Sequence, residues 1–220
     1  MLMNKVVVFG TGIQAKLIHY LLTNDSDYEV VAFTVESKYI TSLTFLDLPV
    51  IPFEEMTGKY PPSECKMFLA LGAQNRNELR ERVFINIKDK GYEMINYISS
   101  KAQTWPDLVV GENVFILQAT SIEPFVGIGN NVVLIGSQIG QHVKIEDNCF
   151  ISTATIGSDV YVGKNVFMGI NAMVNPYVRI GMKSIIGPGS IITKDVEPYE
   201  VYTAHPSIKS DVDSRKLRIM

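Results

Sequence analysis

Residues 128–185 read IGNNVV-LIGSQ-IGQHVK-IEDNCF-ISTAT-IGSDVY-VGKNVF-MGINAM-VNPYVR-IGMKSI, part of a six-residue repeat that runs from residue 110 to residue 197. An aliphatic residue opens each unit, and glycine often follows it. Such a regular period is typical of a β-solenoid. The openers are Val110, Ile116, Ile122, Ile128, Leu134, Ile139, Ile145, Ile151, Ile156, Val162, Met168, Val174, Ile180, Ile186 and Ile192.

Three such units make one turn of a triangular prism, so openers three units apart stack in columns. One predicted column contains Leu134, Ile151, Met168 and Ile186. Each turn adds about 4.8 Å, the spacing of hydrogen-bonded strands. Pairing along the axis satisfies the backbone amides, and the aliphatic openers fill the core. Function is therefore expected on the outside of the prism.

Two units, residues 134–138 and 151–155, are one residue short, and both fall in the same column on successive turns. Losing one residue twice at the same corner reshapes one edge of the prism. We expect a functional site beside such an irregularity in an otherwise regular repeat. His142 comes soon after the first short unit.

The first ninety residues follow a different pattern. Residues 5–9 (KVVVF) form a β-branched run typical of a strand buried on both faces, and residues 13–22 predict an amphipathic helix. Strands are expected at residues 29–35 and 66–72, and a second helix at about residues 77–90. Strand, glycine turn, helix and strand in this order predict a small Rossmann-like α/β unit.

Two glycine turns follow the first and third of these strands. Ligands of open α/β sheets bind at the carboxyl ends of the strands, and backbone N–H groups at a helix start suit phosphate. Arg76 is either a fork for a phosphate or base carbonyl, or a solvated charge. Glu36 is either an acceptor for a ribose hydroxyl or an exposed loop carboxylate. The predicted substrate edge contains Gly10, Gly12, Glu36, Gly72, Asn75 and Arg76.

Composition excludes several classes of function. The chain has 220 residues, 20 Lys and Arg, 23 Asp and Glu and a formal net charge of -3, without the basic block that nucleic-acid binding needs. The two cysteines, Cys65 and Cys149, lack metal-type spacing. No apolar stretch is long enough for a membrane span, and the apolar start is too short for a signal peptide. We expect a soluble cytoplasmic protein with no metal and no nucleic-acid or membrane partner.

The chain resembles the left-handed β-helix sugar acyltransferases. Within them it is similar to the branch of sialic-acid O-acetyltransferases and N-acetyltransferases of nucleotide-linked 4-amino-6-deoxy sugars. The resemblance rests on VVVFGTGIQAKLI, FLALGAQNRNELR, GSQIGQHVKIEDN and GPGSIITKDVEP. It implies a nucleotide-sugar-binding domain at residues 1–97, a left-handed parallel β-helix at residues 108–205 and a tail at residues 206–220.

The resemblance also implies a homotrimer with active sites between neighbouring prisms and acetyl-CoA as acyl donor. The nucleotide half of the sugar substrate would bind at the two glycine turns. Gly169, Asn171 and Gly187 would line the track of the pantetheine arm, where small residues leave room. Lys194 would either meet a coenzyme phosphate or be a solvated lysine at the end of the prism.

The sequence departs from the family pattern at the catalytic base. The family has a histidine in I-G-H-D, whereas here Ile139-Gly140 is followed by Gln141 and His142. A second family histidine, in the first glycine turn, is replaced by Gln14. Three interpretations stay open: His142 is the base because the short unit shifts the register, Gln141 positions the substrate, or no side chain acts as base.

Chemistry favours an amine as acceptor. A hydroxyl group needs a general base, which contributes about 10²- to 10⁴-fold in rate, whereas a neutral amine is already nucleophilic. We therefore predict acetyl-CoA-dependent N-acylation of a nucleotide-linked amino deoxy sugar for surface glycan synthesis. O-acetylation of a sugar is the alternative, and a non-catalytic trimeric binding or scaffold protein is the alternative from another class.

Overall fold

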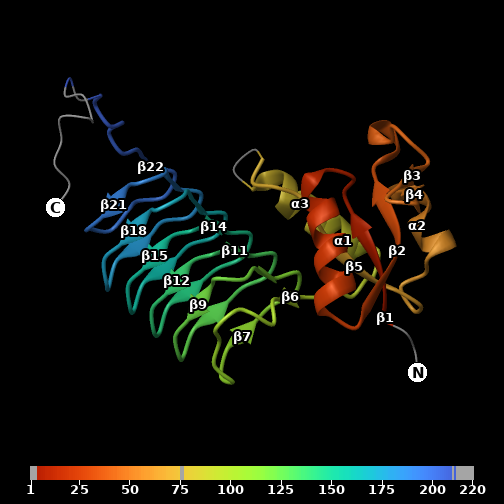
Figure 1. Cartoon of the computed structure of the whole chain (residues 1–220), viewed down its shortest axis with the longest axis horizontal. Helices are drawn as coiled ribbons and strands as arrows, with labels where there is room; N and C mark the ends of the chain where they lie inside the picture. Colours follow the sequence, from red (N-terminus) through yellow and green to blue (C-terminus); the bar gives the residue numbers. More distant parts are fainter. Residues whose placement is uncertain (1–3, 75–76, 210, 212–220) are drawn as a thin grey trace.

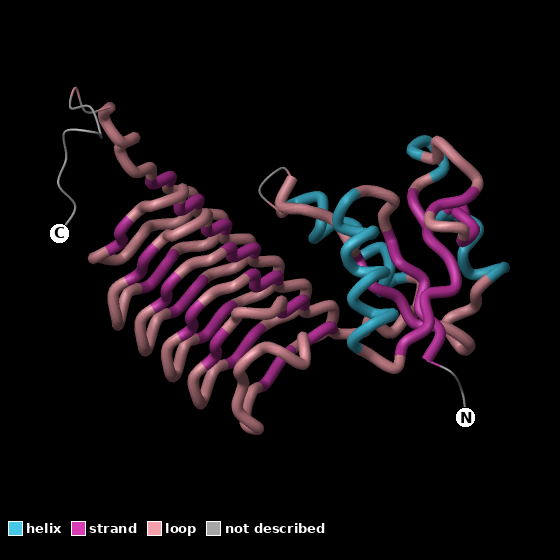
Figure 2. The backbone as a smooth tube through the Cα atoms, viewed as in Figure 1, coloured by secondary structure: helices cyan, strands magenta, loops and turns pink. Residues whose placement is uncertain are grey.

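The computed structural model describes residues 4–74, 77–209 and 211. Two parts make up the molecule, an α/β domain at the N-terminus and a prism of stacked coils (Figures 1 and 2). The prism is a left-handed parallel β-helix. The left-handed β-helix of the predicted fold class is therefore confirmed, and an α/β domain precedes it.

A five-stranded sheet of order β3-β4-β2-β1-β5 forms the N-terminal domain, and only the pairing of β3 with β4 is antiparallel. Side chains of β1 alternate between the two faces of the sheet. Val6 and Val8 pack on the side of α1, and Val7 and Phe9 on the side of α3. Helices thus cover both faces, which explains the continuous apolar run of β1. The elements are β1 (Asn4–Phe9), α1 (Ile13–Asp25), β2 (Tyr28–Val35), β3 (Thr44–Phe45), β4 (Leu48–Pro52), α2 (Met56–Lys59), β5 (Lys66–Leu69) and α3 (Glu78–Asp89), with single 3-10 turns at Ser37–Tyr39 and Phe53–Glu55.

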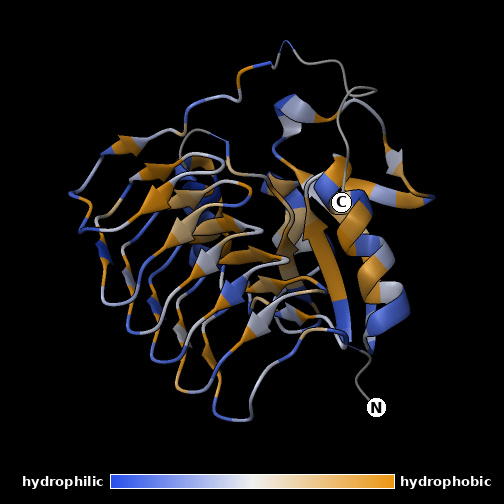
Figure 3. Ribbon diagram, turned by 60° about the vertical axis from the view of Figure 1, so that its left-hand side comes forward, coloured by the Kyte–Doolittle hydropathy of each residue, from blue (hydrophilic) through white to orange (hydrophobic). Residues whose placement is uncertain are grey.

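Hydrophobic residues dominate the strands of this sheet, whereas α1 has both hydrophobic and hydrophilic stretches (Figure 3). Ala15, Ile18 and Leu22 are the buried residues of α1. Ile13 was expected on the same apolar face but is 87% exposed. It is the first residue of the helix, at the open end beside the glycine turn.

Three parallel sheets form the faces of the prism. The docking face consists of β6 (Tyr97–Ile98), β8 (Phe115–Ile116), β11 (Val133–Ile135), β14 (Phe150–Ser152), β17 (Phe167–Met168), β20 (Ile185–Ile186) and β22 (Val201–Tyr202). The second face consists of β9 (Ser121–Ile122), β12 (Gln138–Ile139), β15 (Thr155–Ile156), β18 (Met173–Val174) and β21 (Ile191–Ile192). The third face consists of β7 (Val109–Val110), β10 (Gly127–Ile128), β13 (Lys144–Ile145), β16 (Tyr161–Val162) and β19 (Arg179–Ile180).

The predicted columns of openers are confirmed. Leu134 pairs with Ile151, Ile151 with Met168, and Met168 with Ile186, and all four are fully buried. The docking face starts at β6, within the segment that the sequence placed before the prism.

Each corner of the prism turns through a residue in the left-handed conformation, which Asn and Asp tolerate better than other non-glycine residues. Between the third face and the docking face this position forms the asparagine corner, with Asn113, Asn131, Asn148 and Asn165 at φ between +55° and +63°. Between the second and third faces it forms the histidine corner, with Phe125, His142, Asp159 and Tyr177 at φ between +57° and +66°.

The remaining corner, between the docking face and the second face, contains both short units. There the left-handed residues are Gly136 (φ +55°) and Thr153 (φ +45°), one place earlier in the unit than Asn171 in a full-length unit. Strands β12 and β15 on the following face keep regular pairing. The register shift is therefore absorbed at this short corner and does not reach His142.

The N-terminal domain packs on the docking face. Phe115, Val133 and Phe150 point outward from that face into the same apolar cluster as Ile18 and Phe68. The ring of Phe68 meets that of Phe115 edge to face at 6.2 Å. The two parts therefore share one hydrophobic core across their junction, which fixes where the sheet edge lies relative to the prism.

Candidate functional site

A cavity of about 310 Å³ lies at the carboxyl edge of the N-terminal sheet. It opens beyond β1 and β2 and is closed on one side by α3. We call it the edge pocket. Its lining includes Phe9, Gly10, Thr11, Gly12, Val35, Glu36, Tyr39, Leu71, Gln74, Leu79, Arg82 and Val83. Gly10, Gly12 and Glu36, three of the candidate substrate residues, thus line the same pocket.

The two glycines of the first turn have different structural demands. Gly10 has φ +128°, and a Cβ atom there would lie 2.9 Å from the carbonyl oxygen of Ala70. Gly12 is the N-cap of α1, and a Cβ atom at this position would meet nothing within 4 Å. No side chain caps α1, and no acidic residue lies in its first turn. The N–H groups at this helix start are therefore suited to an anion.

Charged side chains stand at the opposite wall of the edge pocket. Glu36 pairs with Lys38 at 3.1 Å and with Arg82 at 3.5 Å. The hydrogen bond from Lys38 to Glu36 raises the pKa of the lysine. Arg82 is half exposed. The pocket therefore offers a carboxylate for hydroxyl groups and a guanidinium for carbonyl or phosphate oxygens.

Sequence reasoning missed Arg82 and Tyr39. Leu79, Arg82 and Val83 lie on one face of α3 because residues three and four apart are neighbours on a helix. Counting from the expected helix start would have placed Arg82 beside the apolar residues that face the sheet. Nothing comparable in the sequence pointed to Tyr39, which belongs to a short 3-10 turn.

Two other candidate substrate residues, Gln14 and Gly72, do not line the edge pocket. Gln14 faces a much smaller cavity of about 10 Å³ between the two domains. Gly72 is half-buried directly after Leu71 but is absent from the lining. Asn75 and Arg76 lie outside the described residues.

Gln141 and His142 are exposed at the histidine corner, on the edge between the second and third faces. The imidazole of His142 stacks on Phe125, with ring centroids 4.8 Å apart and planes at 13°. Among the described residues, no side chain forms a hydrogen bond or ion pair with this imidazole. Within residues 4–74, 77–209 and 211, no acid is therefore placed to orient His142 as a base.

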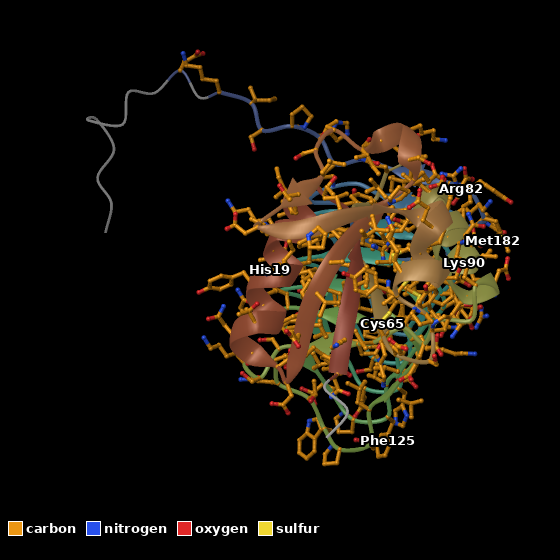
Figure 4. The ribbon with its side chains drawn as sticks, turned by 90° about the vertical axis from the view of Figure 1, so that its right-hand side faces the viewer. His19, Cys65, Arg82, Lys90, Phe125 and Met182 are labelled. Atoms are coloured by element: carbon orange, nitrogen blue, oxygen red, sulfur yellow. The ribbon has the colours of Figure 1, made fainter. Side chains whose placement is uncertain are left out.

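Within one molecule, the edge pocket and the histidine corner lie far apart in space. Figure 4 shows Arg82 of the pocket and Phe125 of the corner at opposite ends of the molecule. Packing explains this separation, because the N-terminal domain covers the docking face, whereas His142 lies on the edge between the other two faces. A single chain does not bring its two groups of candidate residues together.

The predicted coenzyme residues occupy two different edges. Gly169, Asn171 and Gly187 lie at the short corner, and Lys194 lies exposed on the turn that leaves the second face. Stacking of coils already accounts for the glycines: a Cβ atom would lie 2.8 Å from Pro188 Cδ at Gly169, and 2.8 Å from the carbonyl oxygen of Tyr202 at Gly187. Asn171 is exposed beside them.

Within residues 4–74, 77–209 and 211, no group of three His, Cys, Asp or Glu side chains is arranged to hold a metal ion. In the same part of the chain, no helix has the length and apolar character for a membrane crossing.

Comparison with known proteins finds a similar fold in solved structures of acetyltransferases. No family model matches the chain. The bifunctional protein GlmU of Streptococcus uberis is 32% identical over 110 residues, which are 41% of this chain and 24% of that protein. The chain thus spans about a quarter of the length of such relatives.

Two solved structures match most of the chain. PerB from Caulobacter crescentus, in complex with CoA and GDP-perosamine, has a TM-score of 0.78 at 24% identity and covers 90% of this chain and 93% of its own. The acetyltransferase domain of PglB from Neisseria gonorrhoeae has a TM-score of 0.78 at 18% identity, with coverage of 88% and 93%. At these identities the likeness establishes a shared two-domain fold.

Proposed function

We propose that this protein is an acetyl-CoA-dependent N-acyltransferase that acts on the amino group of a nucleotide-linked amino deoxy sugar. The observation that carries the proposal is the edge pocket, a glycine-lined pocket at a helix start, on a domain docked to a hexapeptide prism. PerB, which has the same pair of domains, was crystallised with CoA and a nucleotide-linked sugar.

In this proposal the domain of residues 1–97 holds the nucleotide half of the substrate. The diphosphate lies beside Gly10 and against the N–H groups at the start of α1, which begins after Gly12 and has no side-chain cap. Glu36 accepts hydrogen bonds from ribose hydroxyls, and Arg82 contacts oxygens of the base or phosphates. Asn75 and Arg76, which lie outside the described residues, are additional candidates for the same ligand.

The chemical step is attack of the neutral sugar amine on the thioester carbonyl of acetyl-CoA. The new C–N bond forms, the C–S bond breaks, and the coenzyme leaves as its thiolate, which takes up a proton. The amine loses one proton in the same process. We assign His142 as the group that accepts it and Gln141 as a group that positions the substrate, since both side chains are exposed on the prism edge. An amine acceptor fits this weakly anchored base better than a hydroxyl does.

A second copy of the chain is required to complete such a site. Because the edge pocket and the histidine corner lie apart in one chain, we propose a homotrimer in which the sugar of one copy reaches the prism edge of a neighbour. Apolar side chains on the second face fit this arrangement, with Met173 48% and Ile191 65% exposed. Gly169, Asn171, Gly187 and Lys194 are the candidates for coenzyme contacts. We place the enzyme in the cytoplasm, in surface glycan synthesis.

The test is release of free thiol from acetyl-CoA with a panel of dTDP-, UDP- and GDP-linked amino sugars and their matched hydroxyl sugars. Release with an amino sugar and not with its hydroxyl counterpart supports the proposal. Release only with hydroxyl acceptors assigns O-acetylation instead. Silence with every acceptor, while the nucleotide still binds, assigns a non-catalytic binding protein.

A further inference from the structure

Arg80 of α3 is among the largest fully buried side chains of the described residues, at 1% exposure. Burial lowers the pKa of its guanidinium to about 10, so the group stays protonated at neutral pH. Charges this deep in proteins are usually paired with an opposite charge, because desolvation of an unpaired ion is costly. Arg80 therefore calls for a physical explanation.

The partners of Arg80 are all neutral. Nη1 donates to the carbonyl oxygen of Leu71 at 2.6 Å, and Nη2 donates to the backbone and side-chain oxygens of Asn131 at 2.9 and 2.7 Å. Nε is buried without a partner. Within the part of the chain that the structure describes, no carboxylate pairs with this guanidinium. The positive charge is thus solvated by dipoles but not balanced.

This charge lies directly behind the wall of the edge pocket. Leu71, which accepts from Arg80, also lines that pocket. The neighbouring Ala70 borders Gly10, where an added Cβ atom would lie 2.9 Å from the carbonyl oxygen of Ala70, at the turn where the proposed diphosphate lies. The protein interior has a low dielectric constant, so the charge of Arg80 is little screened between the guanidinium and the pocket wall.

We propose that Arg80 is a specificity-determining residue whose unbalanced charge makes the edge pocket select nucleoside diphosphates over uncharged nucleosides. The inference rests on the proposed nucleotide-sugar function. Arg80 acts through space and through the carbonyl of Leu71, without touching the ligand. The bound diphosphate supplies the counter-charge that the protein itself does not provide.

Calorimetric titration tests this selection without any catalysis. UDP, GDP and dTDP are compared with uridine, guanosine and thymidine on the full chain and on Arg80→Met and Arg80→Lys. We expect Arg80→Met to weaken binding of the preferred diphosphate by about 10-fold or more, with the matching nucleoside changed by less than about 3-fold. Arg80→Lys retains the charge and is expected to recover most of the selectivity.

A second variant leaves Arg80 in place and balances its charge. Asn131→Asp keeps an oxygen for Nη2, and aspartate tolerates the left-handed backbone at this position. The amide of Asn148 can flip to donate to the new carboxylate, in place of accepting from Asn131. We expect the diphosphate to bind about 10-fold more weakly here too, with nucleoside binding unchanged.

The outcomes separate the two levels of inference. If diphosphate and nucleoside affinities fall by the same factor in Arg80→Met and their ratio is unchanged in Asn131→Asp, Arg80 is only a strut between the domains and the inference is overturned. If the wild-type chain binds none of the nucleotides, the nucleotide pocket itself fails, and the inference falls with it. If the preference for diphosphate over nucleoside persists in 0.5 M NaCl for the wild type and is lost in Arg80→Met and Asn131→Asp, a buried source of charge is supported.

Discussion

The asparagine corner and the histidine corner have the same backbone and opposite surroundings. Both turn through left-handed residues at nearly equal φ angles. At the asparagine corner, Asn113, Asn131, Asn148 and Asn165 are at most 5% exposed. At the histidine corner, Phe125 is 63% and Tyr177 76% exposed. The repeat therefore dictates the turn, and contacts outside the coil dictate which residue occupies it.

Contacts with the N-terminal domain explain the asparagines. Asn113 accepts from the N–H of Leu69 at 2.8 Å, and Asn131 accepts from Arg80 at 2.7 Å. Asn165 donates to Glu81 at 2.9 Å. The side-chain amides also bond along the column, from Asn113 to Asn131 and from Asn131 to Asn148. This ladder receives β5 and α3 of the N-terminal domain, while Arg80 Nε and Asn77 Oδ1 stay buried without hydrogen-bond partners along the same contact.

The largest expected effect comes from breaking the ladder. Asn131→Ala removes the side-chain acceptor of a buried guanidinium and interrupts the column, which we expect to cost about 4 kcal/mol of unfolding free energy. Asp159→Ala is the matched control, because it makes the same left-handed change at the exposed corner and should cost about 1 kcal/mol. Urea unfolding of both variants measures the difference. Equal losses would show that only the turn matters.

Substitution of His142 at the histidine corner should lower the activity and leave the stability unchanged. His142→Asn is expected to lower kcat at least about 100-fold with the preferred amino sugar, equivalent to about 2.7 kcal/mol of barrier, while thermal unfolding stays the same. His205→Asn, at an exposed histidine of the C-terminal tail, is the control. An unchanged kcat in His142→Asn would remove this residue as the base and leave the amine to react without a side-chain acceptor.

The two glycines of the edge-pocket turn differ in the same way as the two corners, because Gly10 matters for stability and Gly12 for ligand binding. Gly10→Ala forces a Cβ atom against the carbonyl of Ala70 at a strained φ, and should destabilise the protein by about 2 kcal/mol. Gly12→Ala meets open space and should change stability by less than about 0.5 kcal/mol. The same variant should still weaken nucleotide binding, because the added methyl group occupies the pocket. Chemical denaturation and calorimetry on both variants would reveal whether the two glycines exchange these roles.

The smallest expected effect concerns pH. Hydrogen bonds from Ser100, Tyr97 and Ser99 lower the pKa of Asp25 from 3.8 to about 2 and join α1 to the start of the docking face. A depressed pKa stabilises the fold above pH 3.8, and this contribution is lost as the pH falls towards 2. The thermal stability of the wild type should therefore fall more over this pH window than that of Asp25→Asn. Parallel curves for the two proteins would contradict the assignment.

Several features of the site could be predicted from the sequence. Gly10, Gly12 and Glu36 follow strands of a parallel sheet, and the carboxyl ends of such strands meet at one edge. The place of Arg82 was readable in principle from the helix period. Gln14 could not be placed, because its environment depends on Phe150 and Asn113 of the prism, which no local pattern connects to the first helix.

The register of His142 could not be predicted from the sequence either. Two short units next to this residue left open whether the missing residue shifts it, and the pairing of β12 with β15 shows that the turn absorbs the shift locally. The outcome depends on the backbone of one corner, where Gly136 and Thr153 turn one residue early.

By itself, the sequence determined the prism, its three columns and its corners, because each six-residue unit interacts mainly with the equivalent unit one coil away and the repeat makes every contact local. Only the tertiary structure decided which corner holds the N-terminal domain and why Arg80 is buried. The contact between Arg80 and Asn131 joins residues 51 positions apart, and no sequence periodicity predicts it. It is fixed by the fit of one sheet edge to a column of asparagines, and no single segment encodes it.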